Sequence, residues 1–87
     1  MADSWLLFNT KCMLGRILLQ QQQLDEGREL LIEGYQGMME RIEQIPDAGR
    51  PRLREAVTAL IELAKDSDDA EAIEKWQSEL DDLPNQE

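Results

Sequence analysis

Four carboxylates lie close together in the C-terminal half of the chain, at Asp66, Asp68, Asp69 and Glu71. Oxygen ligands at short spacing are what Ca²⁺ requires. An EF-hand loop, however, needs acids at alternate positions, a central glycine and a more distant bidentate glutamate. The glycine is missing here, and the Asp68-Asp69 pair breaks the alternation. The pattern favours a solvated turn that caps a helix, and we expect no metal and no other cofactor.

Cys12 is the only cysteine, and the chain has no histidine. A catalytic thiol needs a base to activate it, whereas the neighbours Met13 and Leu14 are apolar. We therefore interpret Cys12 as a packing residue. Because one cysteine allows no internal disulfide, the sequence favours a reducing, cytoplasmic compartment. No acid–base or nucleophile set is recognisable, so the sequence predicts that the chain is not an enzyme and has no catalytic residue.

Arginines and aromatic residues are the remaining candidates for ligand contact. Arg50, Arg52 and Arg54 form a basic patch that could bind a carboxylate or a phosphate. Such arginines more often pair with acids on an adjacent helix. Tyr35 and Trp76 could stack on a ligand, but both fall on apolar seams, so we expect them to pack in the core.

The composition restricts the class of partner. Nine basic and nineteen acidic residues give a net charge of −10, and 41% of the 87 residues are hydrophobic. This acidic balance disfavours a nucleic acid and an anionic membrane surface. No apolar run approaches the length of about 18 residues that a transmembrane helix requires. The N-terminal residues lack the basic start and long apolar stretch of a signal peptide. These features disfavour both classes of partner without indicating the one that the chain binds.

The spacing of apolar residues predicts an all-α domain of four helices. Helix-starting and helix-ending residues bound the four segments: Asp3 or Ser4, Asp25, Pro46, Pro51, the turn 66–69, and Pro84. The segments form two antiparallel helical hairpins, one at about 4–45 and one at about 52–83, joined by a loop at 46–51. The chain is thus predicted to be a single domain of residues 1–87.

Each predicted helix has an apolar face that should be buried. The expected inward residues are Trp5, Phe8, Cys12, Met13, Ile17 and Leu18 in the first helix, Leu24, Leu31, Tyr35, Met38, Ile42 and Ile45 in the second, Leu53, Ala56, Val57, Leu60, Ile61 and Ala64 in the third, and Ile73, Trp76, Leu80 and Leu83 in the fourth. Glycines at 27, 34 and 37 lie within the second pattern. Since glycine costs about 1 kcal/mol against alanine in a helix, these three predict close contact with a neighbouring helix.

Met13-Leu14-Gly15, followed nineteen residues later by Gly34-Tyr35, fits the alternation of large and small contacts in the tetratricopeptide repeat. The wider string resembles the last tetratricopeptide-type segment of bacterial serine/threonine protein kinases of the planctomycete kind. The string comprises residues 5–15, 30–38, Ile45-Pro46, 52–56 and Lys75-Trp76. The second hairpin departs from the repeat, with Ala64 at an expected tyrosine and Ile73 at an expected alanine. The sequence motifs of a kinase domain are absent from these 87 residues.

The resemblance implies a right-handed tetratricopeptide-like array, in which the first and third helices line a concave groove. Carried over by position, the residues of that groove are Asn9, Arg16, Gln20, Glu55, Thr58, Glu62 and Lys65. The implied function is a non-catalytic protein–protein interaction or scaffolding module, the terminal part of a longer helical repeat array attached to a bacterial signalling kinase. The alternative is a free-standing helical bundle that homodimerises through the first helix, because the run 5–8 is unusually apolar for a monomer surface.

Overall fold

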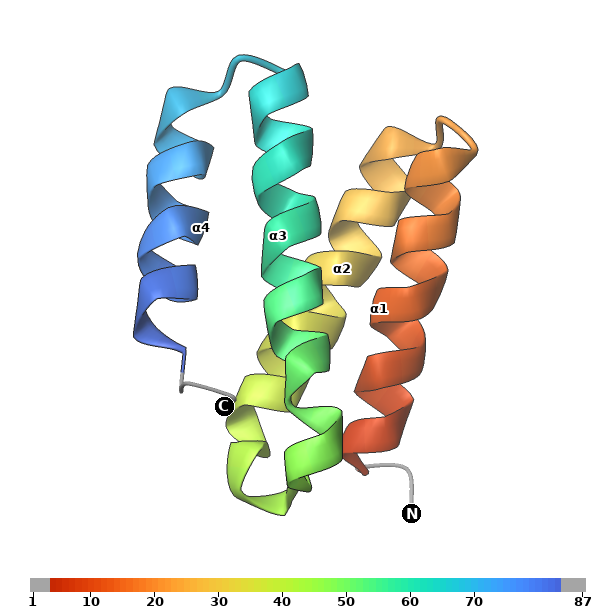
Figure 1. Cartoon of the computed structure of the whole chain (residues 1–87). Helices are drawn as coiled ribbons and strands as arrows, with labels where there is room; N and C mark the ends of the chain where they lie inside the picture. Colours follow the sequence, from red (N-terminus) through yellow and green to blue (C-terminus); the bar gives the residue numbers. More distant parts are fainter. Residues whose placement is uncertain (1–3, 84–87) are drawn as a thin grey trace.

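The described part of the chain folds into four α-helices, whose arrangement is shown in Figure 1. The structure, a computed structural model, describes residues 4–83. The helices are α1 (Trp5–Gln20), α2 (Leu24–Glu40), α3 (Pro51–Asp66) and α4 (Ala70–Asp82). Two short 3-10 helices, η1 (Ile42–Gln44) and η2 (Asp47–Gly49), lie between α2 and α3. No strand is present within residues 4–83, which confirms the all-α prediction.

The helices form two hairpins, α1–α2 and α3–α4, and α3 is the central element of the view in Figure 1. Helices α1 and α2 pack along each other, and α3 packs against α2. Helix α4 covers the side of α3 that is turned away from α1. Helix α3 thus has neighbours on two sides, whereas α1 and α4 lie at the two edges of the molecule.

Glycines bring the backbones of α1 and α2 into direct contact. A Cβ atom on Gly15 would lie 2.8 Å from the carbonyl oxygen of Gly27, and a Cβ on Gly27 would lie 2.8 Å from that of Gly15. A Cβ on Gly34 would lie 2.6 Å from the carbonyl oxygen of Phe8. Since no side chain fits in these spaces, the close helix contact that the glycines predicted is confirmed.

The helix starts follow the predicted caps in two of three described cases. The Ser4 hydroxyl oxygen accepts a hydrogen bond from the Leu6 backbone N–H at 3.1 Å, and Asp69 Oδ1 accepts one from that of Ala72 at 3.2 Å. The prediction for α2 is wrong, because the helix already begins at Leu24. Asp25 instead lies in its first turn, where its carboxylate is 3.0 Å from the Arg28 guanidinium. Asp3 and Pro84, the other predicted boundary residues, lie outside the described residues.

Helix α2 ends earlier than predicted, at Glu40 rather than Ile45. Arginine side chains donate to one carbonyl group in the last turn of α2 and to two beyond its end. Arg41 Nη1 donates to the Gly37 carbonyl at 2.9 Å, and Arg50 donates to the carbonyls of Ile45 at 3.3 Å and Ile42 at 3.5 Å. Ile45 is still buried although the helix has ended, so the apolar spacing extends beyond the helix itself.

Most residues of the core belong to α2, α3 and α4, and α1 contributes Cys12. Tyr35 and Trp76 are both buried there, and their rings meet edge to face with centroids 5.9 Å apart and an interplanar angle of 86°. The Tyr35 hydroxyl donates a hydrogen bond to Glu79 Oε1 at 2.6 Å, which connects α2 to α4. The prediction that both rings serve core packing is confirmed.

The predicted apolar face of α1 is wrong in two positions. Phe8 and Cys12 face α2, where they contact the sites of Gly37 and Gly34. Met13 and Ile17, which were expected to lie inward with them, are exposed. The apolar residues of α1 cover too wide an arc for one face, and the glycine-lined contact with α2 buries only a narrow part of that arc. By contrast, all six inward positions predicted for α3 are buried.

Candidate functional site

A groove with a volume of about 760 Å³ lies between α3, which lines it from Pro51 onward, and the end of α1 with the α1–α2 turn. The sequence-predicted residues Arg16, Gln20, Glu55, Thr58 and Glu62 line it. The structure adds lining residues that the sequence analysis did not assign to the groove: Leu19, Gln22, Leu24, Pro51, Arg54, Ala59, Leu63, Asp66 and Ser67. The groove therefore combines side chains from both hairpins.

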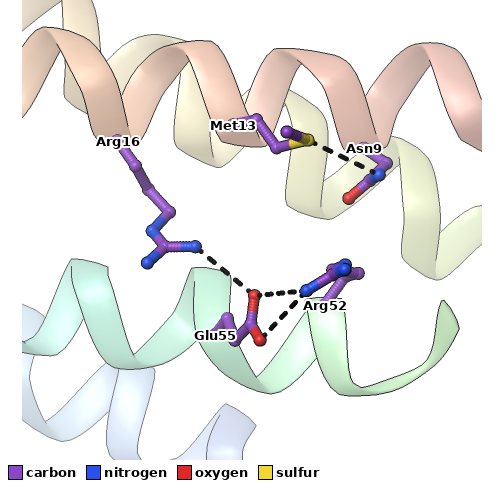
Figure 2. Close-up of polar contacts among 5 residues, drawn as sticks. All are labelled: Asn9, Met13, Arg16, Arg52 and Glu55. Atoms are coloured by element: carbon purple, nitrogen blue, oxygen red, sulfur yellow. Dashed lines mark hydrogen bonds and ion pairs between the residues drawn. The ribbon is translucent and has the colours of Figure 1, made fainter.

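Two of the predicted groove residues lie apart from it. Lys65 is exposed near the end of α3 and does not line the groove. Asn9 lies nearer the start of α1, where its Nδ2 is 3.9 Å from the Met13 sulfur (Figure 2). Its Oδ1 is buried and has no hydrogen-bond partner within residues 4–83. Both positions were carried over from a repeat pattern, which gives the helix face but not where a groove ends along that face.

Glu55 is the polar link across the groove. Its Oε1 lies 3.3 Å from Arg16 Nη1 of α1, and Arg52 Nη1 donates to both of its carboxylate oxygens at 3.2 Å (Figure 2). The two guanidinium groups approach the carboxylate from opposite sides. All three side chains are about half exposed, so each pair contributes at most about 1 kcal/mol.

The three arginines of the predicted basic patch are used in different ways. Arg50 turns toward the carbonyl groups of the α2–α3 connection, and Arg52 pairs with an acid on its own helix, not on an adjacent one. Arg54 is exposed and lines the groove. Arg16 pairs with an acid on another helix, and the sequence analysis assigned it to the groove without naming this partner.

The groove lining is chemically mixed. Beside the Arg16–Glu55 pair it carries one further cation, Arg54, and two further carboxylates, Glu62 and Asp66. Leucines from three elements add apolar surface: Leu19 from α1, Leu24 from α2 and Leu63 from α3. Leu24 was predicted to be buried, but it is 42% exposed and presents its side chain to this groove. Such a lining can accept an apolar side chain with charged groups on either side of it.

Cys12 is buried against α2, where its Sγ lies 3.9 Å from the Leu31 carbonyl oxygen. Burial raises the pKa of the thiol to about 12, and the charge of Arg16 opposes this only in part. The sulfur therefore stays protonated at neutral pH, which suits a packing residue.

Two acidic residues, Asp68 and Asp69, form the tight turn between α3 and α4. Asp68 has a φ of 56°, in the left-handed region, and Asp69 caps α4. Across the part of the chain that the structure describes, no three His, Cys, Asp or Glu side chains come together as a group that could hold a metal ion.

A second surface, which we call the α1 outer face, consists of Leu6, Leu7, Met13, Leu14 and Ile17. These side chains are between 41% and 56% exposed. The homodimer alternative drawn from the sequence used the run 5–8, but Trp5 and Phe8 turn inward, toward Gly49 and Gly37. The exposed apolar surface therefore extends along the helix instead of concentrating at its first turn.

No protein-family model, curated protein or solved structure matches this chain. None of the helices within residues 4–83 is long and apolar enough to cross a membrane.

Proposed function

We propose that the chain is a non-catalytic protein-interaction module whose recognition surface is the groove between α1 and α3. The observation that carries this proposal is the groove itself, a hollow of about 760 Å³ built from both hairpins. Its size lies in the range of surface hollows that enclose a ligand of several chemical groups.

The expected ligand is a peptide segment with an apolar anchor and at least one basic side chain. Leu19, Leu24 and Leu63 offer apolar contact to the anchor. Glu62 and Asp66 offer carboxylates to the basic residue, and the net charge of −10 attracts a cationic segment from a distance. Arg54 can pair with an acid elsewhere in the same peptide.

The finer architecture extends this proposal. In a right-handed tetratricopeptide-like array, the first helix of each hairpin lines the concave surface, and α1 and α3 do share the groove here. The resemblance to the terminal segment of planctomycete-type kinases then implies that the module forms the terminal part of a longer array attached to a bacterial signalling kinase, in the cytoplasm. The position of Gly15, Gly27 and Gly34 at the α1–α2 contact supports the comparison with that repeat.

Peptide display tests the proposal directly. A random peptide library is selected on the wild-type domain, and the recovered peptides are measured against two variants by fluorescence anisotropy. Thr58→Arg places a long cationic side chain in the groove from an exposed position, and should weaken binding at least about 10-fold, or 1.4 kcal/mol. Gln77→Arg adds the same charge to the exposed surface of α4 and should leave the affinity unchanged.

Two results would contradict the groove as the recognition surface. One is a set of peptides that bind the Thr58→Arg variant as tightly as the wild type. The other is a library that yields no binder above background, while the domain remains folded by circular dichroism.

A further inference from the structure

The α1 outer face has the residue spacing of a helix-pairing seam. Leu6, Thr10, Met13 and Ile17 follow one another at intervals of four, three and four residues, which is the alternation that lets two helices pack side by side. Leu7 and Leu14 lie next to this seam and widen it on one side. From Leu6 to Ile17 the seam is about 16 Å long, which amounts to three turns of helix.

The exposed area is sufficient for association with a copy of the same surface. Its five apolar residues are each about half exposed, which leaves roughly 500 Å² of apolar surface in water, near the upper end for the largest patch on an ordinary monomer. Two such faces together would bury roughly 1,000 Å², the lower end for a specific protein interface. A dimer of modest affinity is what this area supports.

Thr10 is the polar residue within the seam, and its hydroxyl group already makes a hydrogen bond within α1. Its hydroxyl donates a hydrogen bond to the Leu6 carbonyl oxygen at 3.0 Å. A second helix that covers Thr10 would therefore bury a paired donor and a methyl group, not an unsatisfied hydroxyl. The whole seam can leave water without an uncompensated polar group.

Charge directs a second copy to this face. The chain as a whole carries −10, so two copies repel each other over most of their surfaces. Helix α1 contains no acidic residue, and its two cations, Lys11 and Arg16, are paired with Glu33 at 3.5 Å and Glu55 at 3.3 Å. The α1 outer face is thus a neutral, apolar surface on an acidic protein.

We propose that the α1 outer face binds a second copy of this chain, with the two α1 helices antiparallel about a two-fold axis between Thr10 and Met13. Leu6 then packs against Ile17 of the second copy, and Thr10 packs against Met13 of the second copy. The antiparallel orientation also places the two Arg16 side chains at different levels, whereas a parallel pair would bring them to the same level. None of the residues of this face lines the groove, so the inference is independent of the proposed peptide binding. It is an alternative to the longer array, because a preceding hairpin would cover the same face.

Sedimentation of the 87-residue chain over a micromolar to millimolar concentration range tests the association. The wild type should shift from monomer to dimer within this range. Met13→Glu puts a carboxylate from each copy into the centre of the seam, and should raise the dissociation constant at least about 100-fold. Leu24→Glu is the matched control, since Leu24 is similarly exposed but lies outside the α1 outer face, and it should leave the dissociation constant unchanged. Circular dichroism should show that both variants stay folded, because both positions are exposed.

Disulfide formation tests the orientation. A mixture of the Leu6→Cys and Ile17→Cys variants should form mainly the mixed disulfide, because the antiparallel pairing sets these positions in one layer. The buried Cys12 serves as an internal control and should not react in the wild type. Preferential self-crosslinking of Leu6→Cys would overturn the antiparallel orientation.

Two sedimentation results would overturn the proposal as a whole. The first is a wild type that remains monomeric up to millimolar concentration, which would assign the face to another occupant, such as a preceding hairpin of a longer chain. The second is a dimer that Met13→Glu leaves intact or that Leu24→Glu dissociates.

Discussion

The two hairpins are held together by opposite means. Between α1 and α2 the contact is made by glycines, and the backbones themselves touch at Gly15, Gly27 and Gly34. Helices α3 and α4 contain no glycine, and Leu60 and Trp76 are among the large side chains buried there. Hairpin one (α1 and α2) is thus held together by a close contact of small residues, and hairpin two (α3 and α4) by a core of large side chains.

This difference decides which apolar residues are buried. Helices α1 and α3 have the same length of sixteen residues, but α3 buries seven of them and α1 only Cys12 and Gly15. Glycines on α2 leave little surface for the large side chains of α1 to cover, and no other element within residues 4–83 covers the opposite face of α1. The comparison teaches that apolar content alone does not measure burial, because the size of the residues at the contact also matters.

The largest effect is expected from the side-chain core of hairpin two. Trp76→Ala removes a buried ring that meets Tyr35 edge to face, and should lower the free energy of unfolding by about 3–5 kcal/mol. Urea unfolding followed by circular dichroism measures this change. The exposed neighbour Gln77, replaced by alanine, is the control and should have little effect. Equal stability of the two variants would mean that α4 does not depend on this ring.

The glycine contact of hairpin one should be sensitive to a single methyl group. Gly34→Ala would place a Cβ 2.6 Å from the Phe8 carbonyl oxygen and 2.9 Å from the Cys12 nitrogen, both of them backbone atoms. We expect a net loss of about 1–3 kcal/mol in the free energy of unfolding, despite the gain in helix propensity. Gln36→Ala, an exposed substitution in the same helix, serves as the control in thermal unfolding. If Gly34→Ala raises the melting temperature instead, the two backbones are not in contact.

Alkaline pH should weaken two helix contacts in sequence, first the α1–α2 contact at Cys12 and then the α2–α4 contact at Tyr35. Burial raises the pKa of the Cys12 thiol from 9.0 to about 12, and burial with the Glu79 hydrogen bond raises the pKa of Tyr35 above its ordinary value of 10.0. Both groups are protonated when folded, so the stability they contribute is complete below the unfolded pKa and is lost as the pH rises above it. Each group should remove up to about 1.4 kcal/mol per pH unit, from pH 9 for Cys12 and from pH 10 for Tyr35.

Single variants separate the two contributions, because the chain has one cysteine and one tyrosine. In denaturant unfolding at a series of pH values, Cys12→Ala should move the onset of the loss from about pH 9 to about pH 10. Tyr35→Phe should reduce the slope of the free energy of unfolding against pH only above pH 10. An unchanged profile in both variants would show that neither group is buried in its neutral form.

The smallest effect is expected where the hairpins meet across the groove. Arg16→Gln removes the pair with Glu55 at 3.3 Å, in which both side chains are about half exposed. The loss should be at most about 0.5 kcal/mol and should vanish in high salt, because water and ions screen such pairs. A loss above 1 kcal/mol that persists in salt would mean that this pair, not the side-chain core, holds the two hairpins together.

Helix positions were predictable from local patterns, and helix ends only in part. Ser4, Pro51 and Asp69 act through their immediate neighbours, so the sequence located the starts of α1, α3 and α4. The connection after α2 is contacted by Arg50, eight residues beyond Ile42 along the chain, whose guanidinium group donates to the carbonyls of Ile42 and Ile45, and local patterns do not indicate this contact. The groove residues carried over by position fell on the correct helices, but the extent of the groove along them depends on how α1 and α3 approach each other.

Local patterns in the sequence were enough to predict an acidic, all-helical chain with the periodicity of four helices and with glycines placed for one close contact. Periodicity and small-residue spacing are local properties of a helix surface, and they hold whatever the helix packs against. Which arc of α1 is buried depends instead on the packing of the helices. An arc with Met13 and Ile17 is as apolar as one with Phe8 and Cys12, and the choice depends on where α2 and α3 lie. The same arrangement brought Arg16 to Glu55 and left the α1 outer face open.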